Sequence, residues 1–359
     1  MGLPEINIEF KAKAETAVIR SSNGIAALIL YDDTKSGAGN ESYSYGTEAE
    51  INKEDWTTTN QGYLNLAFMG SPKRVIVERK GTEDEIDDIL SRLKNKHWNY
   101  LAIPGIGTES EDVSEVGKWI IAQRAAKKTF KAVLPCSSVS YSPNNMGIID
   151  FATENNKAGL KTYTAAEYCA RIAGLLAGLS LSESATYAVL PELESISESL
   201  TPDEDIDAGK MILINDGEKI KIACENNSLT TLSGDLTEDM KSIKIVEGMD
   251  LIRDDIRTTF EENNIGENNS YDNKMLFVGA VNQYFDELVR NGVLYDQYDN
   301  TADIDIDGTR SYLISKGYDV SEMSETEIKQ ANTGKNIYVS ADVQFSDAIS
   351  NLYFGINMN

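Results

Sequence analysis

Hydrophobic residues in the middle of the chain alternate between two spacings, one typical of strands and one typical of helices. Short runs rich in aliphatic and β-branched residues predict strands at 74–80, 100–104, 131–135 and 147–151. After the first strand, apolar residues in 86–93 recur every three or four positions, which predicts one buried helix face, and a further helix is expected from about 112 to 127. Repeated strand–helix order is typical of a largely parallel sheet covered by helices, so the sequence predicts an α/β fold.

Two Thr-x-x-Glu sequences predict helix starts. In such a capping box, the two side chains bond to the first free amides of the helix. Thr82 and Glu85 precede the helix at 86–93, and Thr164 and Glu167 precede a helix rich in alanine and glycine up to Gly178. Small residues at this helix surface would let another backbone approach closely.

The pattern changes past Glu198. Asn215-Asp-Gly217 stands between the short apolar runs 211–214 and 219–222, which predicts a β-hairpin. Helices are expected from near Met249 and over 273–290, with a polar loop at 261–272 between them. We therefore expect a β-rich N-terminal region (21–80), an α/β domain (81–240) and an α+β C-terminal domain (241–346).

Both ends of the chain alternate apolar and polar residues with no hairpin partner on the same arm of sequence, apart from a pairing between the two C-terminal runs. The apolar members are Ile6, Ile8 and Phe10, and at the other end Val343, Phe345, Leu352, Phe354 and Ile356. An unpaired strand at a free end favours pairing with a sheet edge of another chain. Strand exchange between subunits is therefore expected, through an N-terminal arm (1–20) and a C-terminal arm (347–359). The alternative is that these strands complete the chain's own sheet.

Charge narrows the class of partner. The chain has 33 Lys and Arg against 58 Asp and Glu, a formal net charge of −25. Such a surface repels phosphate at long range, so nucleic acid and anionic membranes are disfavoured. The most apolar stretch, 172–181, is about half of the roughly 20 residues that a membrane-spanning helix needs. With no signal-peptide pattern at the start, we expect synthesis in the cytoplasm and no direct membrane insertion.

The candidate catalytic motifs are incomplete. His97 is the only histidine, and no Gly-x-Ser-x-Gly sequence is present, so a Ser–His–Asp hydrolase lacks its parts. Pro104 to Thr108 follows a strand and precedes a helix, as a phosphate loop would, but the carboxylates at Glu109, Glu111 and Asp112 would repel an anion. The sequence predicts no catalytic residue, no cofactor and no enzyme.

Metal and disulfide chemistry is also disfavoured. Asp303, Asp305 and Asp307 open like a calcium-binding loop, but Ile314 stands where the bidentate Glu belongs. The alternation of Asp with Ile there favours an exposed strand. The three cysteines are an odd number without a Cys-x-x-Cys pair, which favours buried thiols over disulfides or metal ligands: Cys136, Cys169 and Cys224.

The order of these features resembles the contractile phage tail sheath proteins, in particular the short Gram-positive type that includes the sheaths of R-type, diffocin-like bacteriocins. Residues 2–10 and 20–30 are similar to that family's N-terminal arm and first core strand. The stretches 242–255 and 277–294 resemble its C-terminal domain, and 343–354 resembles its C-terminal arm.

The resemblance implies a structural subunit that polymerises as helically stacked hexameric rings around an inner tube. It also implies contraction that drives the tube through a target cell envelope, and a subtilisin-like α/β domain without catalytic residues. The implied partners are other copies of the chain, the inner tail tube protein, and baseplate and tail terminator proteins. The implied location is a virion tail or a bacteriocin particle. Another phage-tail structural protein and an α/β hydrolase are the alternatives.

Overall fold

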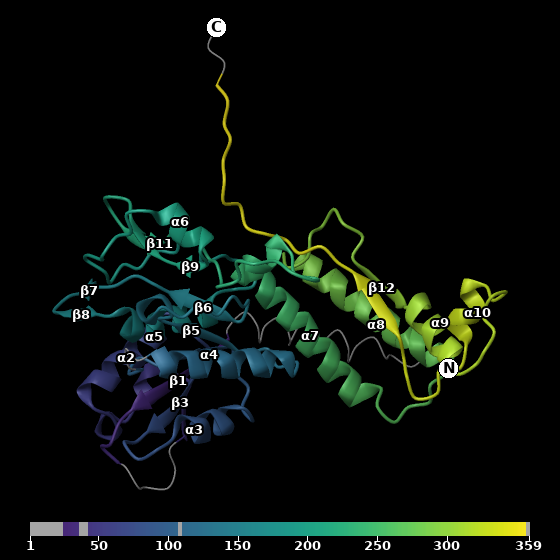
Figure 1. Cartoon of the computed structure of the whole chain (residues 1–359), viewed down its shortest axis with the longest axis horizontal. Coiled ribbons are helices and arrows are strands. Elements are labelled where there is room, and N and C mark those ends of the chain that lie inside the picture. The colour runs from purple at the N-terminus through teal and green to yellow at the C-terminus, as the bar shows by residue number, and fades with distance from the viewer. Residues whose placement is uncertain (1–23, 36–41, 107–109, 357–359) are drawn as a thin grey trace. The chain divides into compact units, whose positions relative to one another are not determined.

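The structure, a computed structural model, describes residues 24–35, 42–106 and 110–356, with the backbone alone at 110 and 111. Its contacts divide the chain into two compact units, each described by itself (Figure 1). Among the described residues, the larger unit comprises 24–247 and 348–356, and the smaller unit comprises 248–347. This division falls a few residues after the boundary expected at 240.

A mostly parallel sheet forms the centre of the larger unit (Figure 1). In the described part of the chain its order is β2-β3-β1-β4-β5-β6-β9. The strands are β1 (Ile25–Tyr31), β2 (Ser42–Tyr45), β3 (Arg74–Lys80), β4 (Tyr100–Ala102), β5 (Lys131–Leu134), β6 (Ile148–Phe151) and β9 (Lys210–Met211). Only β2 runs antiparallel to its neighbour. The predicted α/β class is confirmed, and residues of the expected 21–80 region share this sheet.

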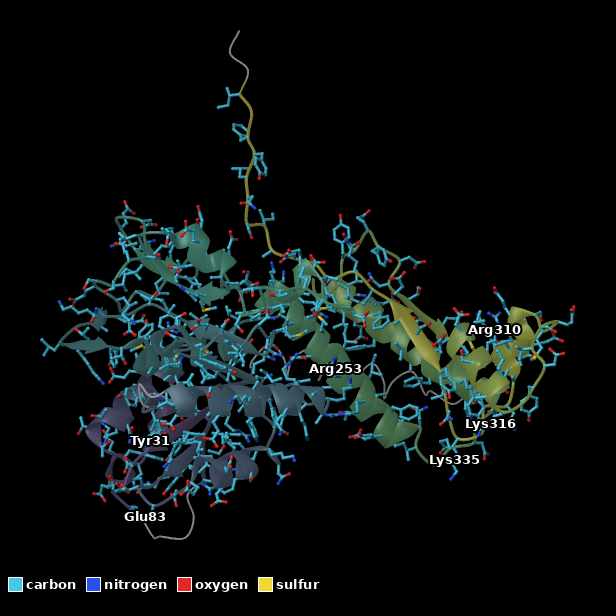
Figure 2. The ribbon with its side chains drawn as sticks, viewed as in Figure 1. Tyr31, Glu83, Arg253, Arg310, Lys316 and Lys335 are labelled. Carbon is cyan, nitrogen blue, oxygen red and sulfur yellow. The ribbon has the colours of Figure 1, made fainter. Side chains whose placement is uncertain are left out.

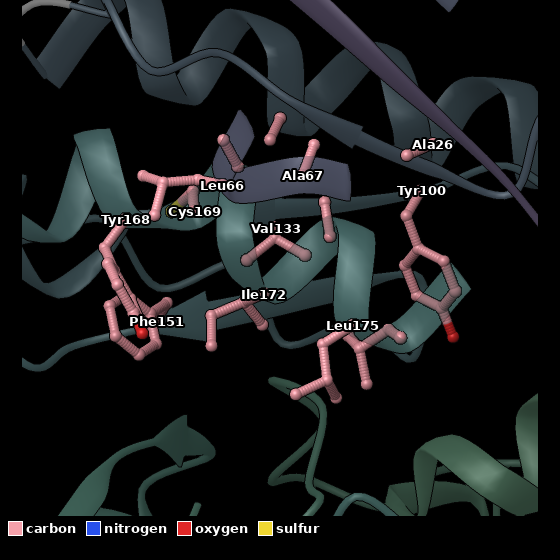
Figure 3. Close-up of a cluster of buried hydrophobic side chains, with 14 of the residues drawn as sticks. Ala26, Leu66, Ala67, Tyr100, Val133, Phe151, Tyr168, Cys169, Ile172 and Leu175 are labelled. Carbon is pink, nitrogen blue, oxygen red and sulfur yellow. The ribbon is translucent and has the colours of Figure 1, made fainter. Parts of the chain in front are cut away.

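Helices cover both faces of the sheet, because successive residues of the central strands point to opposite sides. Ala26, Leu28 and Leu30 of β1 face α2 (Thr58–Phe68) and α5 (Ala165–Gly178). Ala27 and Ile29 face α3 (Ile86–Leu93) and α4 (Ser110–Ala125). Figure 3 shows the first of these cores, with Val133 and Phe151 from the sheet and Ile172 and Leu175 from α5.

The small residues of α5 bring its backbone against the end of α2. A Cβ atom added to Gly174 would overlap the backbone carbonyl of Ala67, and one added to Gly178 would overlap the carbonyl of Gly70. The close approach predicted from the sequence is therefore confirmed. So is the capping box at the start of α5, since Thr164 accepts a hydrogen bond from the amide of Glu167 and the Glu167 side chain accepts one from the amide of Thr164.

The rest of the larger unit consists of short elements. They include β7 (Asn156–Ala158), β8 (Lys161–Tyr163), α6 (Pro202–Asp207), β10 (Leu213–Asn215) and β11 (Ile220–Ile222). The hairpin predicted around Asn215 is confirmed by antiparallel pairing of β10 with β11, and Gly217 in its turn has φ 95°. Met211, expected in that hairpin, instead lies in β9 beside β6.

The smaller unit is built on two long helices, α7 (Ile243–Asn263), of which it contains the part from Gly248 onward, and α8 (Tyr271–Arg290). The rings of Phe260 and Phe277 meet edge to face at 5.3 Å, and the Tyr284 hydroxyl donates a hydrogen bond to Asp255. The elements that follow them in the chain are β12 (Thr301–Ile304), α9 (Ile306–Ser315), α10 (Glu325–Gln330) and β13 (Val339–Asp342). Strands β12 and β13 pair antiparallel.

Two helix starts differ from the sequence prediction. Thr82 does not cap α3, because its hydroxyl and amide both donate to Asp33, at 2.6 and 2.9 Å, and Glu85 precedes the helix without a side-chain cap. Helix α7 begins at Ile243 and not near Met249, because Glu225 accepts hydrogen bonds from the Ser242 hydroxyl and the Lys244 amide.

Candidate assembly surfaces

The C-terminal arm exposes large apolar side chains. Residues 349–356 belong to no helix or strand, and their trace is extended in Figure 1. The exposed fractions are 97% for Ile349, 84% for Leu352, 94% for Tyr353, 77% for Phe354 and 74% for Ile356. A run of uncovered apolar side chains of this size is typical of a surface that binds another molecule.

Val343 and Phe345 lie in a different environment from Leu352, Phe354 and Ile356. Phe345 forms an antiparallel bridge with Leu294, and its ring packs so closely on Gly248 that an added Cβ would lie 2.8 Å from it. The flanking backbone is also paired, since Tyr295 donates to the carbonyl of Gln344 at 2.8 Å. Val343 and Phe345 are half-buried within the smaller unit. Ile6, Ile8 and Phe10 lie outside the described residues.

The ribbon of β12 and β13 has two unequal edges. The side chain of Asn282 covers the outer edge of β12, since it donates to the Ala302 carbonyl at 3.1 Å and accepts from the Ala302 amide at 2.7 Å. The polar groups of Ala302 therefore point away from β13, so those of its opposite residue, Ala341, also point outward. Among the described residues, none bonds to that outer edge of β13 at Ala341. The sequence pattern marked neither Asn282 nor this edge.

The only histidine lies at the opposite end of the sheet from the Ser–Asp pair that ends two of its central strands. Ser137 follows β5 and hydrogen-bonds to Asp150 near the end of β6, through its amide at 2.9 Å and through its hydroxyl. His97 precedes β4, at the amino ends of these parallel strands, whereas Ser137 and Asp150 lie at the carboxyl ends. His97 therefore cannot take the proton of Ser137, and no Ser–His–Asp arrangement exists there.

Asp150 should make stability depend on pH. Burial raises its pKa from 3.8 to about 6. Between those values the folded protein holds a proton that the unfolded chain has released, so the free energy of unfolding decreases as pH rises through this range. We expect Asp150→Asn to reduce this decrease by about 2 kcal/mol between pH 4 and pH 7. Urea unfolding at both pH values measures it, with Asp203→Asn as the exposed control. Equal decreases in Asp150→Asn and wild type would contradict the assignment.

The three aspartates of the calcium-like sequence have separate structural roles. Asp303 on β12 pairs with Lys329, Asp305 caps α9 by accepting from the Gly308 amide at 2.9 Å, and Asp307 pairs with Arg310. The expected strand is right for Asp303 and wrong from Asp305 onward, because that cap starts a helix. Within the described ranges, no three His, Cys, Asp or Glu residues are placed to hold a metal ion.

The remaining candidates from the sequence are the three cysteines, the loop that resembled a phosphate site and the apolar stretch. Cys136 and Cys169 are buried, as expected, and Cys224 is half-buried. Gly107 and Thr108 of the loop that resembled a phosphate site lie outside the described residues. In the part of the chain that the structure describes, no helix is both long enough and apolar enough to cross a membrane.

Comparison with protein families gives two matches. Residues 79–226 match the phage tail sheath protein central domain, and residues 235–359 match the phage tail sheath C-terminal domain. The chain is also 34% identical over 369 residues to a tail sheath protein from Clostridium phage phiCD119, with 99% of both chains covered.

Solved structures of similar fold include two sheath proteins. One is the sheath tail protein Lin1278 from Listeria innocua, with a TM-score of 0.68 and 13% identity over 96% of this chain and 100% of the other. The second is the helical sheath of the anti-feeding prophage in its contracted state, with a TM-score of 0.67 and 12% identity over 94% of each chain.

Proposed function

We propose, from the premise that this chain belongs to the phage tail sheath protein family, that its copies polymerise by strand exchange through the C-terminal and N-terminal arms. The protein is a structural sheath subunit and not an enzyme, as that family is. The observation that carries the proposal is the exposed, alternating apolar face of Leu352, Phe354 and Ile356. In a protein that assembles with itself, such a strand has a partner on another copy.

The acceptor in this proposal is the outer edge of β13. Its outward groups at Ala341 can bond to an added strand, whereas Asn282 already occupies the corresponding edge of β12. Added main-chain hydrogen bonds provide affinity, and alternate side chains select the register. The N-terminal residues Ile6, Ile8 and Phe10 have the same alternation and are proposed to act in the same way.

The full assembly that we propose is a stack of hexameric rings, helically arranged around an inner tail tube protein and joined to baseplate and tail terminator proteins. Contraction would drive the tube through a target cell envelope. Solved relatives of the same fold include a sheath in a contracted state and a chain from a baseplate structure, which supports this proposal. The subunit would be made in the bacterial cytoplasm and become part of a virion tail or a bacteriocin particle.

Electron microscopy of the purified protein tests the proposed function. Wide helical cylinders would support a sheath, and narrow tubes would support an inner tube protein. Dispersed single subunits at high concentration and moderate salt would contradict self-assembly of this chain on its own.

Salt should promote assembly. A subunit with a net charge of −25 repels its copies, and salt screens that repulsion over about 8–10 Å at moderate ionic strength. Apolar burial and strand pairing persist under these conditions, whereas exposed ion pairs weaken. We therefore expect light scattering to increase as sodium chloride rises from low to moderate concentration, while circular dichroism stays constant. Scattering that decreases steadily with salt would show that ion pairs dominate the contacts.

A further inference from the structure

The smaller unit contains a pocket of about 470 Å³ between the loop that joins α7 to α8 and the segment before β13. Phe260 and Ile337 form apolar parts of the pocket wall, and Lys274 and Lys335 contribute cationic side chains to it. The side chain of Asn269 holds the two segments together, since it donates to Thr333, Gly334 and Asn336 at 2.8–3.2 Å. The pocket is therefore held open by the chain's own hydrogen bonds.

Lys274 is the unusual residue of this pocket. Its side chain lines the pocket although the residue is only 4% exposed, and its ammonium group donates one hydrogen bond, to the Ala331 carbonyl at 3.0 Å. In the described part of the chain, no carboxylate forms an ion pair with it. It is also the fourth residue of α8, near the helix end where the dipole disfavours a cation.

Three buried cations elsewhere in this protein have carboxylate partners, and one of them is Arg171, which pairs with Glu192 at 2.6 Å. Arg79 pairs with Asp32 at 3.3 Å, and Lys131 pairs with Glu247 at 3.2 Å. A buried ammonium that lacks such a partner destabilises the fold, and burial alone lowers the pKa of Lys274. An anion bound in the pocket would supply the missing charge.

We propose that the Lys274 pocket binds an aspartate or glutamate side chain from a second copy of the chain. The proposal rests on the proposed function, because polymerisation is what brings the second copy. The carboxylate would accept hydrogen bonds from Lys274 while its methylene groups pack on Phe260 and Ile337. Exposed Lys335 adds a second positive charge, and exposed Glu267 on the same wall opposes it with one negative charge.

Charge favours a carboxylate of another copy over a free anion. With 58 acidic residues against 33 basic ones, each neighbour presents an excess of carboxylates. A free phosphate would approach this pocket against the field of a subunit with net charge −25 and would gain no contact outside the pocket. A carboxylate on a neighbour is brought to the pocket by the rest of the interface.

Isotope-mixed cross-linking identifies the occupant. A polymer is assembled from equal parts of ¹⁴N and ¹⁵N subunits and treated with a carbodiimide. The reagent joins the Lys274 nitrogen to a touching carboxyl carbon and takes up the released water as a urea. Mass spectrometry should find heavy–light peptide pairs at Lys274 in the polymer and none in free subunits. A Lys274 that stays unlinked, or that links only within its own copy, would overturn the proposal.

Lys274→Met tests the same residue by energetics, with Lys316→Met as an exposed control from the same unit (Figure 2). Removal of an unpaired buried charge should leave the melting temperature of the free Lys274→Met subunit equal or higher. Its critical concentration for polymerisation should rise about tenfold or more, because the neighbour's carboxylate loses its partner. Lys316→Met should match wild type in both measurements.

The outcomes separate the two proposals. A free Lys274→Met subunit that melts several degrees lower would show a purely structural lysine, and unchanged polymerisation would show an empty pocket in the polymer. Either result overturns the carboxylate site while the sheath assembly stands. A wild-type protein that never polymerises would refute the proposed strand exchange, and this site with it.

Discussion

Deletion of residues 348–359 should leave a folded subunit that no longer polymerises. The removed segment carries Leu352, Phe354 and Ile356, whose side chains are exposed and cover nothing in the described part of the chain's core. Burial of one such side chain stabilises an interface by about 1.5–3 kcal/mol. Three of them contribute at least about 4.5 kcal/mol, so the affinity between copies should fall more than about a thousandfold.

Substitutions in the full-length chain distinguish the effect of the arm's apolar side chains from the effect of shortening the chain. Leu352→Ser, Phe354→Ser and Ile356→Ser together should abolish cylinders as the deletion does, whereas Asn351→Ser with Gly355→Ser, on the intervening positions, should keep them. Sedimentation and electron microscopy measure assembly, and circular dichroism measures folding. Long cylinders from the triple variant would show that the C-terminal arm does not link subunits.

The acceptor side of this contact has its own variant. Ala341→Pro removes the outward N–H of β13 without touching the ladder to β12, because the Ala341 amide does not bond to that strand. It should therefore block polymerisation and leave the subunit folded. Ala341→Val keeps the N–H and should assemble normally. If Ala341→Pro assembles as well as Ala341→Val, the arm pairs with a different edge.

Gly178→Ala should unfold the larger unit or destabilise it by more than about 3 kcal/mol. The added methyl group would overlap the Gly70 carbonyl, and neither backbone can move without separating α5 from α2. Gly174→Ala should act in the same way through the Ala67 carbonyl. Urea unfolding followed by circular dichroism gives the change in free energy of unfolding.

Gly62→Ala is the matched control, because it lies in α2 of the same helix pair and an added Cβ meets nothing within 4 Å. There, alanine should stabilise the helix by about 0.5–1 kcal/mol. A Gly178→Ala protein with the wild-type urea midpoint would mean that the two helices pack less closely than described.

Sequence reasoning found the elements whose hydrophobic pattern is local and missed those that depend on distant residues. Strands β3, β5 and β6 and helix α8 were predicted within a few residues. Helix α2 was not predicted, because an asparagine such as Asn60 is typical of a surface position. In the structure Asn60 is buried, and its side chain donates hydrogen bonds to Asp32 and to the Tyr31 carbonyl. No spacing rule within 58–68 reveals partners that lie some 28 residues earlier.

The assembly surfaces were likewise predictable from the sequence only where the pattern is local. The alternation of Leu352, Phe354 and Ile356 was readable from the sequence, and the structure places these side chains in solvent. The same pattern grouped them with Phe345, which instead pairs with Leu294, because alternation says nothing about which strand is adjacent. Asn282 and Lys274 sit on one helix with ordinary helical spacing, and only tertiary contacts reveal their roles.

The C-terminal arm also has a consequence for the cell that stores free subunits. From Ala348 to Asn359 the sequence contains no charged residue and no proline, the two kinds of residue that commonly interrupt aggregation-prone strands. Such a segment also pairs with sheet edges of unrelated proteins. The net charge of −25 makes subunits repel one another, but salt screens this repulsion. Disordered aggregation of subunits therefore competes with ordered polymerisation from the moment of synthesis. The ratio of subunits to growing ends, and hence the timing of their production, would decide how much protein reaches a finished particle.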